Sequence, residues 1–113
     1  MLTVEQQDEF DNKHDDILQR LADSLIEATP EWWTSATLEL DYQNPQTNEG
    51  PAHTIFNMAF PKEFVTPPDQ MFDITFELLN IFSQYQQRVW KKVIFHVYQE
   101  EDKDWRYEIK YAY

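Results

Sequence analysis

Apolar residues recur along this chain with two different periods, and the order of these periods repeats. From about residue 4 to 28 they recur every three or four residues, which is typical of an α-helix, and a second such stretch covers about residues 68–87. Two stretches of strictly alternating residues follow each helix, which indicates half-buried strands. These four stretches are residues 34–42, 53–60, 93–98 and 105–113. The order α-β-β-α-β-β predicts an α+β fold in which two αββ units form one four-stranded antiparallel sheet, with helices packed on it.

The helix ends carry recognisable signals. Thr3 to Gln6 fits a capping box at the start of the first helix, and Pro30 ends that helix because it forces Thr29 out of the α region. Thr66, followed by two prolines and Asp69, predicts the start of the second helix. The second helix is apolar on most sides, so we expect it to be buried. In the second strand, one face is expected to carry three large apolar residues, Phe56, Met58 and Phe60.

A weak internal repeat supports two equivalent units. At an offset of 57 residues, Trp33 matches Trp90, and two apolar strand residues of the first unit match two of the second. Both tryptophans stand just before a strand that follows a helix. We therefore predict that Trp33 and Trp90 are structural anchors. With no linker and no low-complexity segment, residues 1–113 are predicted to form a single domain.

Residue counts argue against most kinds of catalytic site. The chain has one glycine, Gly50, whereas phosphate-binding loops and nucleophile elbows need several. It has no cysteine, and no pair of its three histidines has the i, i+4 spacing of a helical metal site. Glu39 and Asp41, with His96, could be imagined as an acid–base site, but no nucleophile accompanies them. We expect no enzymatic activity, no metal and no cofactor.

The net charge of −12 restricts the possible partners. Nucleic acids and anionic membranes would repel such a chain, whereas a basic protein would be attracted. Solubility alone is the simpler explanation of the charge. The first sixteen residues are mostly polar, and no apolar run is long enough to cross a bilayer, so we expect no signal peptide, no membrane and a cytoplasmic protein.

Two sets of residues are candidates for binding a partner. The first is an acidic cluster on the first helix, where like charges repel and a basic partner would relieve the repulsion; the alternative is a solvated face. The second is the sheet face that points away from the aromatic residues, where acids mix with apolar side chains as in an interface; the alternative is that the first helix covers part of this face. The helical acids are Asp8, Asp11, Asp15 and Asp16. The residues expected on the sheet face are Thr37, Glu39, Asp41, Ile55, Asn57, Ile94, His96, Tyr98, Arg106, Glu108 and Lys110.

Three segments resemble the YezG-like family of bacterial immunity proteins. The run from Leu25 through Pro30-Glu31-Trp32-Trp33 into a strand is similar to the helix, P-E-x-W, strand opening of that family. A Trp-led strand from Trp90 to Tyr98, a charged turn and then Tyr107-x-Ile109-x-Tyr111-x-Tyr113 resemble its end. Phe60-Pro61 before a Leu- and Phe-rich helix also fits. The resemblance covers roughly residues 17–113, and the long acidic first helix departs from the family pattern.

What the resemblance implies is an antitoxin that binds and neutralises a cognate toxin domain. An acidic inhibitor suits a basic nuclease, because its carboxylates take the place of substrate phosphates. The alternative from another class is an acidic secretion chaperone or adaptor that binds an extended segment of a partner protein. An enzyme is the third choice.

Overall fold

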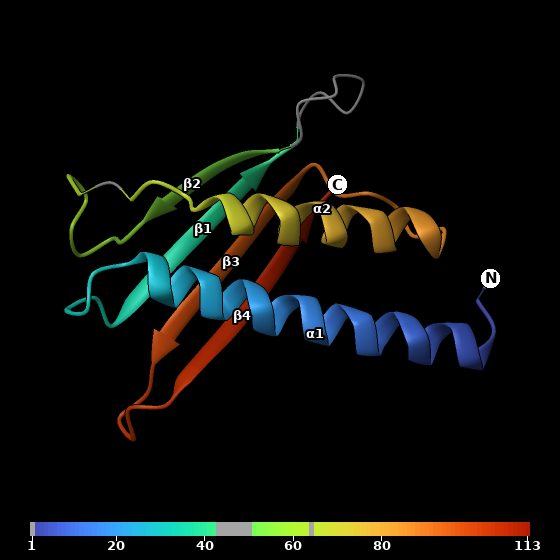
Figure 1. Cartoon of the computed structure of the whole chain (residues 1–113), viewed down its shortest axis with the longest axis horizontal. Coiled ribbons are helices and arrows are strands. Elements are labelled where there is room, and N and C mark those ends of the chain that lie inside the picture. Colours follow the sequence, from blue (N-terminus) through green and yellow to red (C-terminus); the bar gives the residue numbers. More distant parts are fainter. Residues whose placement is uncertain (1, 43–50, 64) are drawn as a thin grey trace.

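The computed structural model describes residues 2–42, 51–63 and 65–113, and it confirms the predicted order of elements. Two helices and four strands follow one another as α-β-β-α-β-β (Figure 1). The elements are α1 (Val4–Ala28), β1 (Ser35–Asp41), β2 (Ala52–Phe56), α2 (Asp69–Gln84), β3 (Lys92–Gln99) and β4 (Trp105–Ala112). The loop predicted at residues 44–51 lies almost entirely outside the described residues. Neither α1 nor α2 has an apolar stretch that could cross a membrane.

The two αββ units meet at the middle of one antiparallel sheet. The strand order is β2-β1-β3-β4, so the first strand of each unit is central and the second is at an edge. Leu38 of β1 pairs with Phe95 of β3, and these two residues are also equivalent in the sequence repeat. The two units are therefore related by an approximate two-fold axis through this central pair.

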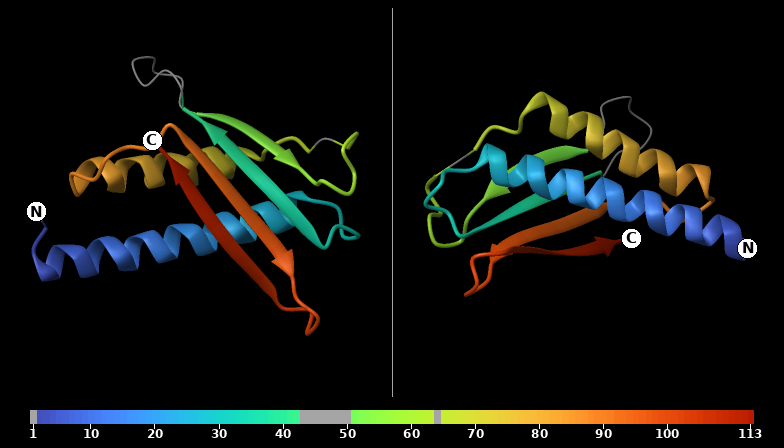
Figure 2. Two further views of the ribbon diagram at one scale, coloured as in Figure 1. Left: turned by 180° about the vertical axis from the view of Figure 1, so that it is seen from behind. Right: turned by 60° about the horizontal axis from the view of Figure 1, so that its bottom comes forward.

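Both helices cover the same face of the sheet. Figure 2 shows α1 and α2 side by side on one side of the strands, and no described element covers the other side. The core between the layers is formed by α1, α2 and the central strands, where Leu38, Leu40, Val93 and Phe95 are fully buried. The alternative that α1 covers part of the outer sheet face is therefore wrong.

The first helix begins and ends where the sequence predicts. The Thr3 side chain accepts a hydrogen bond from the Gln6 backbone N–H at 3.1 Å, and the Gln6 side chain accepts one from Thr3 N at 2.9 Å. This reciprocal capping box satisfies two backbone donors that the first turn leaves free. At the other end Thr29 is extended, with φ −99° and ψ 154°, as a residue before proline must be.

The second strand is shorter than predicted, and its faces are reversed. Ile55, expected to point outward, pairs with Leu38 and is 1% exposed, whereas Phe56 lies opposite Thr37 on the outer face. Met58 is 82% exposed, and Asn57 turns the chain out of the sheet by bonding to Ser35 O and Ala59 N. A one-residue shift of register exchanges the two faces of a strand, and only the pairing with β1 fixes that register here.

The second helix differs from the prediction at its start and in its burial. It begins at Asp69 after Pro68, which makes no side-chain cap, so the predicted Thr66 cap is wrong. Phe72 and Phe76 are 37% and 46% exposed. A two-layer molecule buries only the side of a helix that meets the other elements, so an apolar residue on the far side stays in water.

Trp33 and Trp90 are both 1% exposed, and each lies just before a central strand. Because β1 and β3 are antiparallel, the two indoles lie at opposite ends of the sheet. Trp33 stacks on Phe60, with ring centroids 6.2 Å apart. Trp90 packs beside Tyr42 and Tyr111.

Candidate functional site

The two predicted sets of binding residues lie on opposite sides of the sheet. Asp8, Asp11, Asp15 and Asp16 belong to α1, which covers the inner face. Glu39 and Asp41 on β1, and Ile94, His96 and Tyr98 on β3, lie on the uncovered outer face, because their cross-strand partners alternate with the core residues. A single compact partner surface cannot contact both sets at once.

The outer face has a half-buried centre on β3. His96 stacks on Tyr98 with ring centroids 5.6 Å apart and planes 19° apart. Nδ1 of His96 lies 3.0 Å from the Thr37 hydroxyl on β1. These contacts fix the His96 ring against its neighbours. They do not bring it to Glu39, which lies opposite Ile94 and Thr54.

Charge on this outer face is balanced. Glu39 is paired with Lys92 at 3.0 Å, and Lys92 also lies opposite Asp41. The strand residues of this face include three acids and three bases: Glu39, Asp41, Glu108, Lys92, Arg106 and Lys110. The face therefore offers no net attraction to a basic partner. No group of three metal-binding side chains occurs among residues 2–42, 51–63 and 65–113.

The negative charge of the protein is concentrated in the helix layer. Within α1 there are eight acids and two bases, giving −6, and within α2 three acids and no base, giving −3. The helices thus hold −9 of the net −12. A basic molecule that approaches the helix side meets a strongly negative field.

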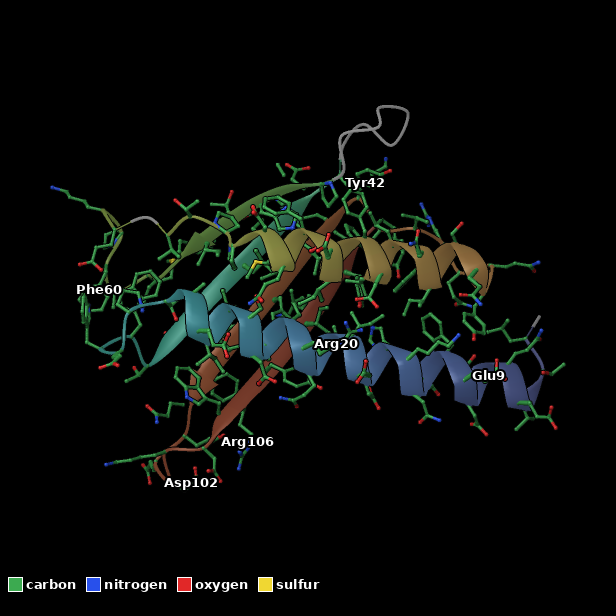
Figure 3. The ribbon with its side chains drawn as sticks, in the orientation of Figure 1. Glu9, Arg20, Tyr42, Phe60, Asp102 and Arg106 are labelled. Carbon is green, nitrogen blue, oxygen red and sulfur yellow. The ribbon has the colours of Figure 1, made fainter. Side chains whose placement is uncertain are left out.

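Asp16 and the other helical acids have different surroundings. Arg20, labelled in Figure 3, lies on α1. It donates to Asp16 at 3.0 Å and to both carboxylate oxygens of Glu77 on α2, at 2.6 and 3.1 Å, so it ties the two helices together. The mutual pairing raises the pKa of the Arg20 guanidinium, chiefly through Glu77. Asp16 is therefore partly neutralised on the α2 side of α1.

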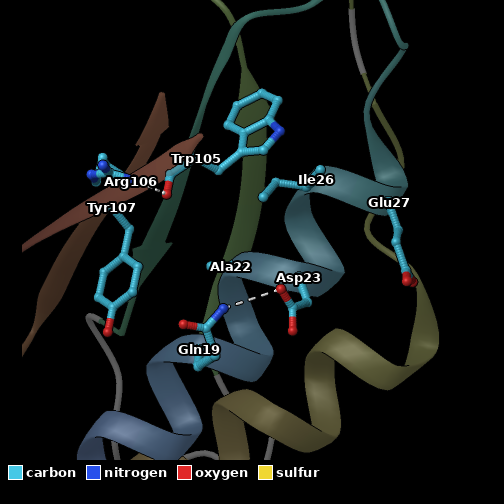
Figure 4. A pocket seen from close by; sticks show the side chains of 8 residues that line it. All are labelled: Gln19, Ala22, Asp23, Ile26, Glu27, Trp105, Arg106 and Tyr107. Carbon is cyan, nitrogen blue, oxygen red and sulfur yellow. Dashed lines mark hydrogen bonds between the residues drawn. The ribbon is translucent and has the colours of Figure 1, made fainter. Parts of the chain in front are cut away.

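On its other side, α1 forms a groove with the edge strand β4. The groove measures about 520 Å³, and we call it the β4 groove. Its floor is apolar: Ile26 points toward the Trp105 ring, and Ala22 and Tyr107 lie farther along (Figure 4). The full lining is Gln19, Ala22, Asp23, Ile26, Glu27, Trp105, Arg106 and Tyr107.

A row of carboxylates continues along α1 from this groove toward the N-terminus of the helix. Asp8, Asp11 and Asp15 lie three and four residues apart, and Asp15 is four and seven residues before groove-lining residues, so all share one stripe of the helix. With Asp23 they form what we call the acidic rim. All four are exposed, and none makes an ion pair with another described residue.

The pKa values of Tyr107 and His14 are both affected by the acids of the rim. Burial raises the pKa of the Tyr107 phenol, and the negative charge of Asp15 raises it further. His14 Nε2 lies 2.6 Å from the Tyr111 hydroxyl, which links α1 to β4. Burial lowers the pKa of His14, although Asp15 and Asp11 oppose this shift.

The first three acids of the rim are evident from the sequence, but the β4 groove is not. In the sequence Trp105 and Tyr107 are only alternating strand residues, and Asp23 does not stand out from the other acids of the helix. A sequence signal does exist, because β4 alternates four large apolar residues with charged ones, as an edge strand beside a helix does. Nothing local, however, shows that the helix leaves part of that strand uncovered.

Comparison with known proteins gives no assignment: the sequence matches no protein-family model, and no curated protein matches it. The resemblance to YezG-like immunity proteins therefore stays a prediction.

Proposed function

We propose that this chain is an immunity protein that binds and neutralises a cognate toxin domain, and that the toxin domain is a basic nuclease. The observation that carries the proposal is the concentration of −9 in the helix layer, against a charge-balanced outer sheet face. A nuclease must attract the phosphates of its substrate, so its active-site cleft is basic. Exposed carboxylates on a rigid helix imitate those phosphates.

The docking surface that we propose is the acidic rim. Its carboxylates have no basic partner within the described chain, so they are available to the basic groups of another protein. Glu39, in contrast, is already paired with Lys92. The proposal places the protein in the cytoplasm, requires no cofactor, and assigns it no catalytic step of its own.

A matched pair of double variants tests the surface. Asp11→Lys/Asp15→Lys and Glu39→Lys/Asp41→Lys each change the net charge by the same amount, on opposite sides of the sheet. The measurement is the association rate with the C-terminal domain of a toxin encoded beside this gene, at low and at physiological salt. We expect the rim variant to slow association roughly tenfold or more at low salt, and less at higher salt, because ions screen the attraction.

The outer-face variant should leave the association rate close to that of the unmodified protein. If that variant alone slows association, the outer face is the docking surface and our choice of surface is wrong. If the toxin domain is not bound at all, or if association ignores salt and both variants, the immunity function is wrong in the form proposed. The acidity would then serve solubility.

A further inference from the structure

We propose that an extended segment of the basic partner adds to the sheet as a fifth strand beside β4, and directs alternate Lys or Arg side chains toward the helix layer, where α1 carries the acidic rim. The inference rests on the proposed function and specifies how the partner is held. It depends on three observations: the open edge of β4, the β4 groove and the rim charges.

The first observation is that, within the described residues, one of the two sheet edges is open for its full length and the other is not. The edge strand β2 has five residues, and its outer side is partly closed where Val65 bridges Ile55. The other edge strand, β4, has eight residues, and no described residue pairs with its outer side. A strand edge that is unpaired presents a row of backbone donors and acceptors to any extended chain.

The ladder between β3 and β4 determines which backbone groups are free. Glu100 N donates to Asp104 O at 2.9 Å, and this bond shows which residue pairs of the β3–β4 hairpin are hydrogen-bonded to each other. Pairs in an antiparallel ladder alternate between bonded and non-bonded. The outward backbone groups therefore belong to the residues whose side chains face the helices: Trp105, Tyr107, Ile109 and Tyr111. Arg106 Nη1 lies 3.3 Å from Trp105 O, as expected for an outward carbonyl.

The second observation is the position of the β4 groove along this edge. Ile26 and Ala22 lie near Trp105 and Tyr107, and His14 contacts Tyr111, so α1 crosses the inner side of β4 at an angle (Figure 1). A strand added next to β4 would direct every second side chain toward the helix layer, and it would pass the β4-facing side of α1 where the helix crosses it. The groove leaves room for those side chains.

The third observation selects the chemistry of the segment. On this side α1 carries Asp8, Asp11 and Asp15, none of which is ion-paired within the described residues, and the charge of Asp15 acts on Tyr107 of β4. A Lys or Arg that faces the helices where the added strand passes α1 would therefore meet a carboxylate. A second copy of this chain fits poorly, because pairing two β4 edges would bring two α1 helices, each at −6, toward one another.

Synthetic peptides test the pattern whichever toxin the protein binds. The first probe is a ten-residue capped peptide with Lys at every second position and Thr or Val between. The second has the same composition with its lysines gathered in one half, so it has equal charge but no alternation. By fluorescence anisotropy at low salt, we expect the alternating peptide to bind at least fivefold more tightly. Equal affinities would reduce the contact to general charge attraction and overturn the inference.

Variants of the protein separate the backbone contribution from the charge contribution. Ile109→Pro removes one outward N–H of the open edge, and Ile109→Ala is its control, because it shortens the same side chain and keeps the N–H. We expect Ile109→Pro to weaken the alternating peptide at least fivefold relative to Ile109→Ala. If melting curves show that the proline variant does not fold, Asp11→Asn/Asp15→Asn supplies the test and should weaken the peptide by a similar factor.

Hydrogen exchange locates the contact. Binding of the alternating peptide should slow exchange at the Tyr107 and Ile109 amides. Binding of neither peptide, protection confined to the outer sheet face, or a dimer in sedimentation that protects β4 without peptide, would each overturn the inference. If the protein binds the toxin domain but gives one of these results, the proposed function stands and only the strand-addition mode of binding is wrong.

Discussion

At the scale of single residues, the two equivalent tryptophans differ in how their indole N–H groups are satisfied. Trp33 Nε1 donates to Glu63 Oε2 at 3.0 Å. Trp90 Nε1 is buried and has no hydrogen-bond partner among the described residues. An unpaired buried donor costs about 1–3 kcal/mol. The first unit therefore gains a bond from its tryptophan that the second unit lacks.

Phenylalanine substitutions should reveal this difference. Trp33→Phe and Trp90→Phe remove similar volumes, but only the first loses a hydrogen bond and only the second removes an unpaired donor. We expect Trp33→Phe to lower the free energy of unfolding by about 1–3 kcal/mol more than Trp90→Phe does, measured by urea denaturation. Alanine at either position should cost about 3–5 kcal/mol, which serves as the reference for a buried anchor. An equal or larger loss in Trp90→Phe would contradict this explanation.

At the scale of elements, β2 shows how pairing decides between two possible faces. Its sequence has apolar residues at consecutive positions, Ile55 and Phe56, so alternation alone allows either to point inward. In the structure Ile55 packs under the helices and Phe56 faces the uncovered side. The turn made by Asn57 then carries Met58 out of the sheet.

Alanine scanning of these neighbouring positions should give unequal costs. Ile55→Ala should lower the free energy of unfolding by about 2–5 kcal/mol, because it leaves a cavity in the core. Phe56→Ala should cost roughly 1 kcal/mol or less, because it removes only a cross-strand contact with Thr37. Thermal melting of both variants is sufficient. The reverse order of costs would mean that β2 has the register first expected from its sequence.

At the scale of the whole molecule, a histidine connects each helix to the sheet. His14 of α1 contacts Tyr111 of β4, and His53 of β2 lies 2.9 Å from the Thr75 hydroxyl of α2. Burial lowers the pKa of both histidines below the usual 6.5, against the opposing effects of Asp15 on His14 and of the Pro51 carbonyl on His53. The contact between the two layers thus favours neutral imidazoles.

A lowered pKa in the folded state makes stability depend on pH. Well above pH 6.5 the histidines are neutral in both the folded and the unfolded chain, so the free energy of unfolding is at its full value. As the pH falls through 6.5, the unfolded chain takes up protons first, and the free energy of unfolding decreases. The decrease ends once the pH has passed the lowered pKa of the folded state. We expect the melting temperature to be lower at pH 5.5 than at pH 7.5. His14→Gln/His53→Gln, which cannot titrate in this range, should show a smaller difference. An unchanged difference in that variant would assign the pH dependence to other groups.

The sequence by itself determined the order of the elements, the capping box of α1 and the alternation that buries the central strands. Each of these depends on residues within a few positions of one another, and local geometry sets their period. It also identified the acids of α1 as a surface feature, because exposed charge follows directly from composition and helical spacing.

Tertiary structure alone decided which face of β2 is buried, which phenylalanines of α2 stay in water, and how the acids are divided. Asp16 is paired through Arg20 because α2 lies on that side of α1, while Asp15 acts on Tyr107 because β4 lies on the other. Contacts between segments far apart in the chain fix these outcomes, and a register shift of one residue or a rotation of one helix would change them without altering any local preference.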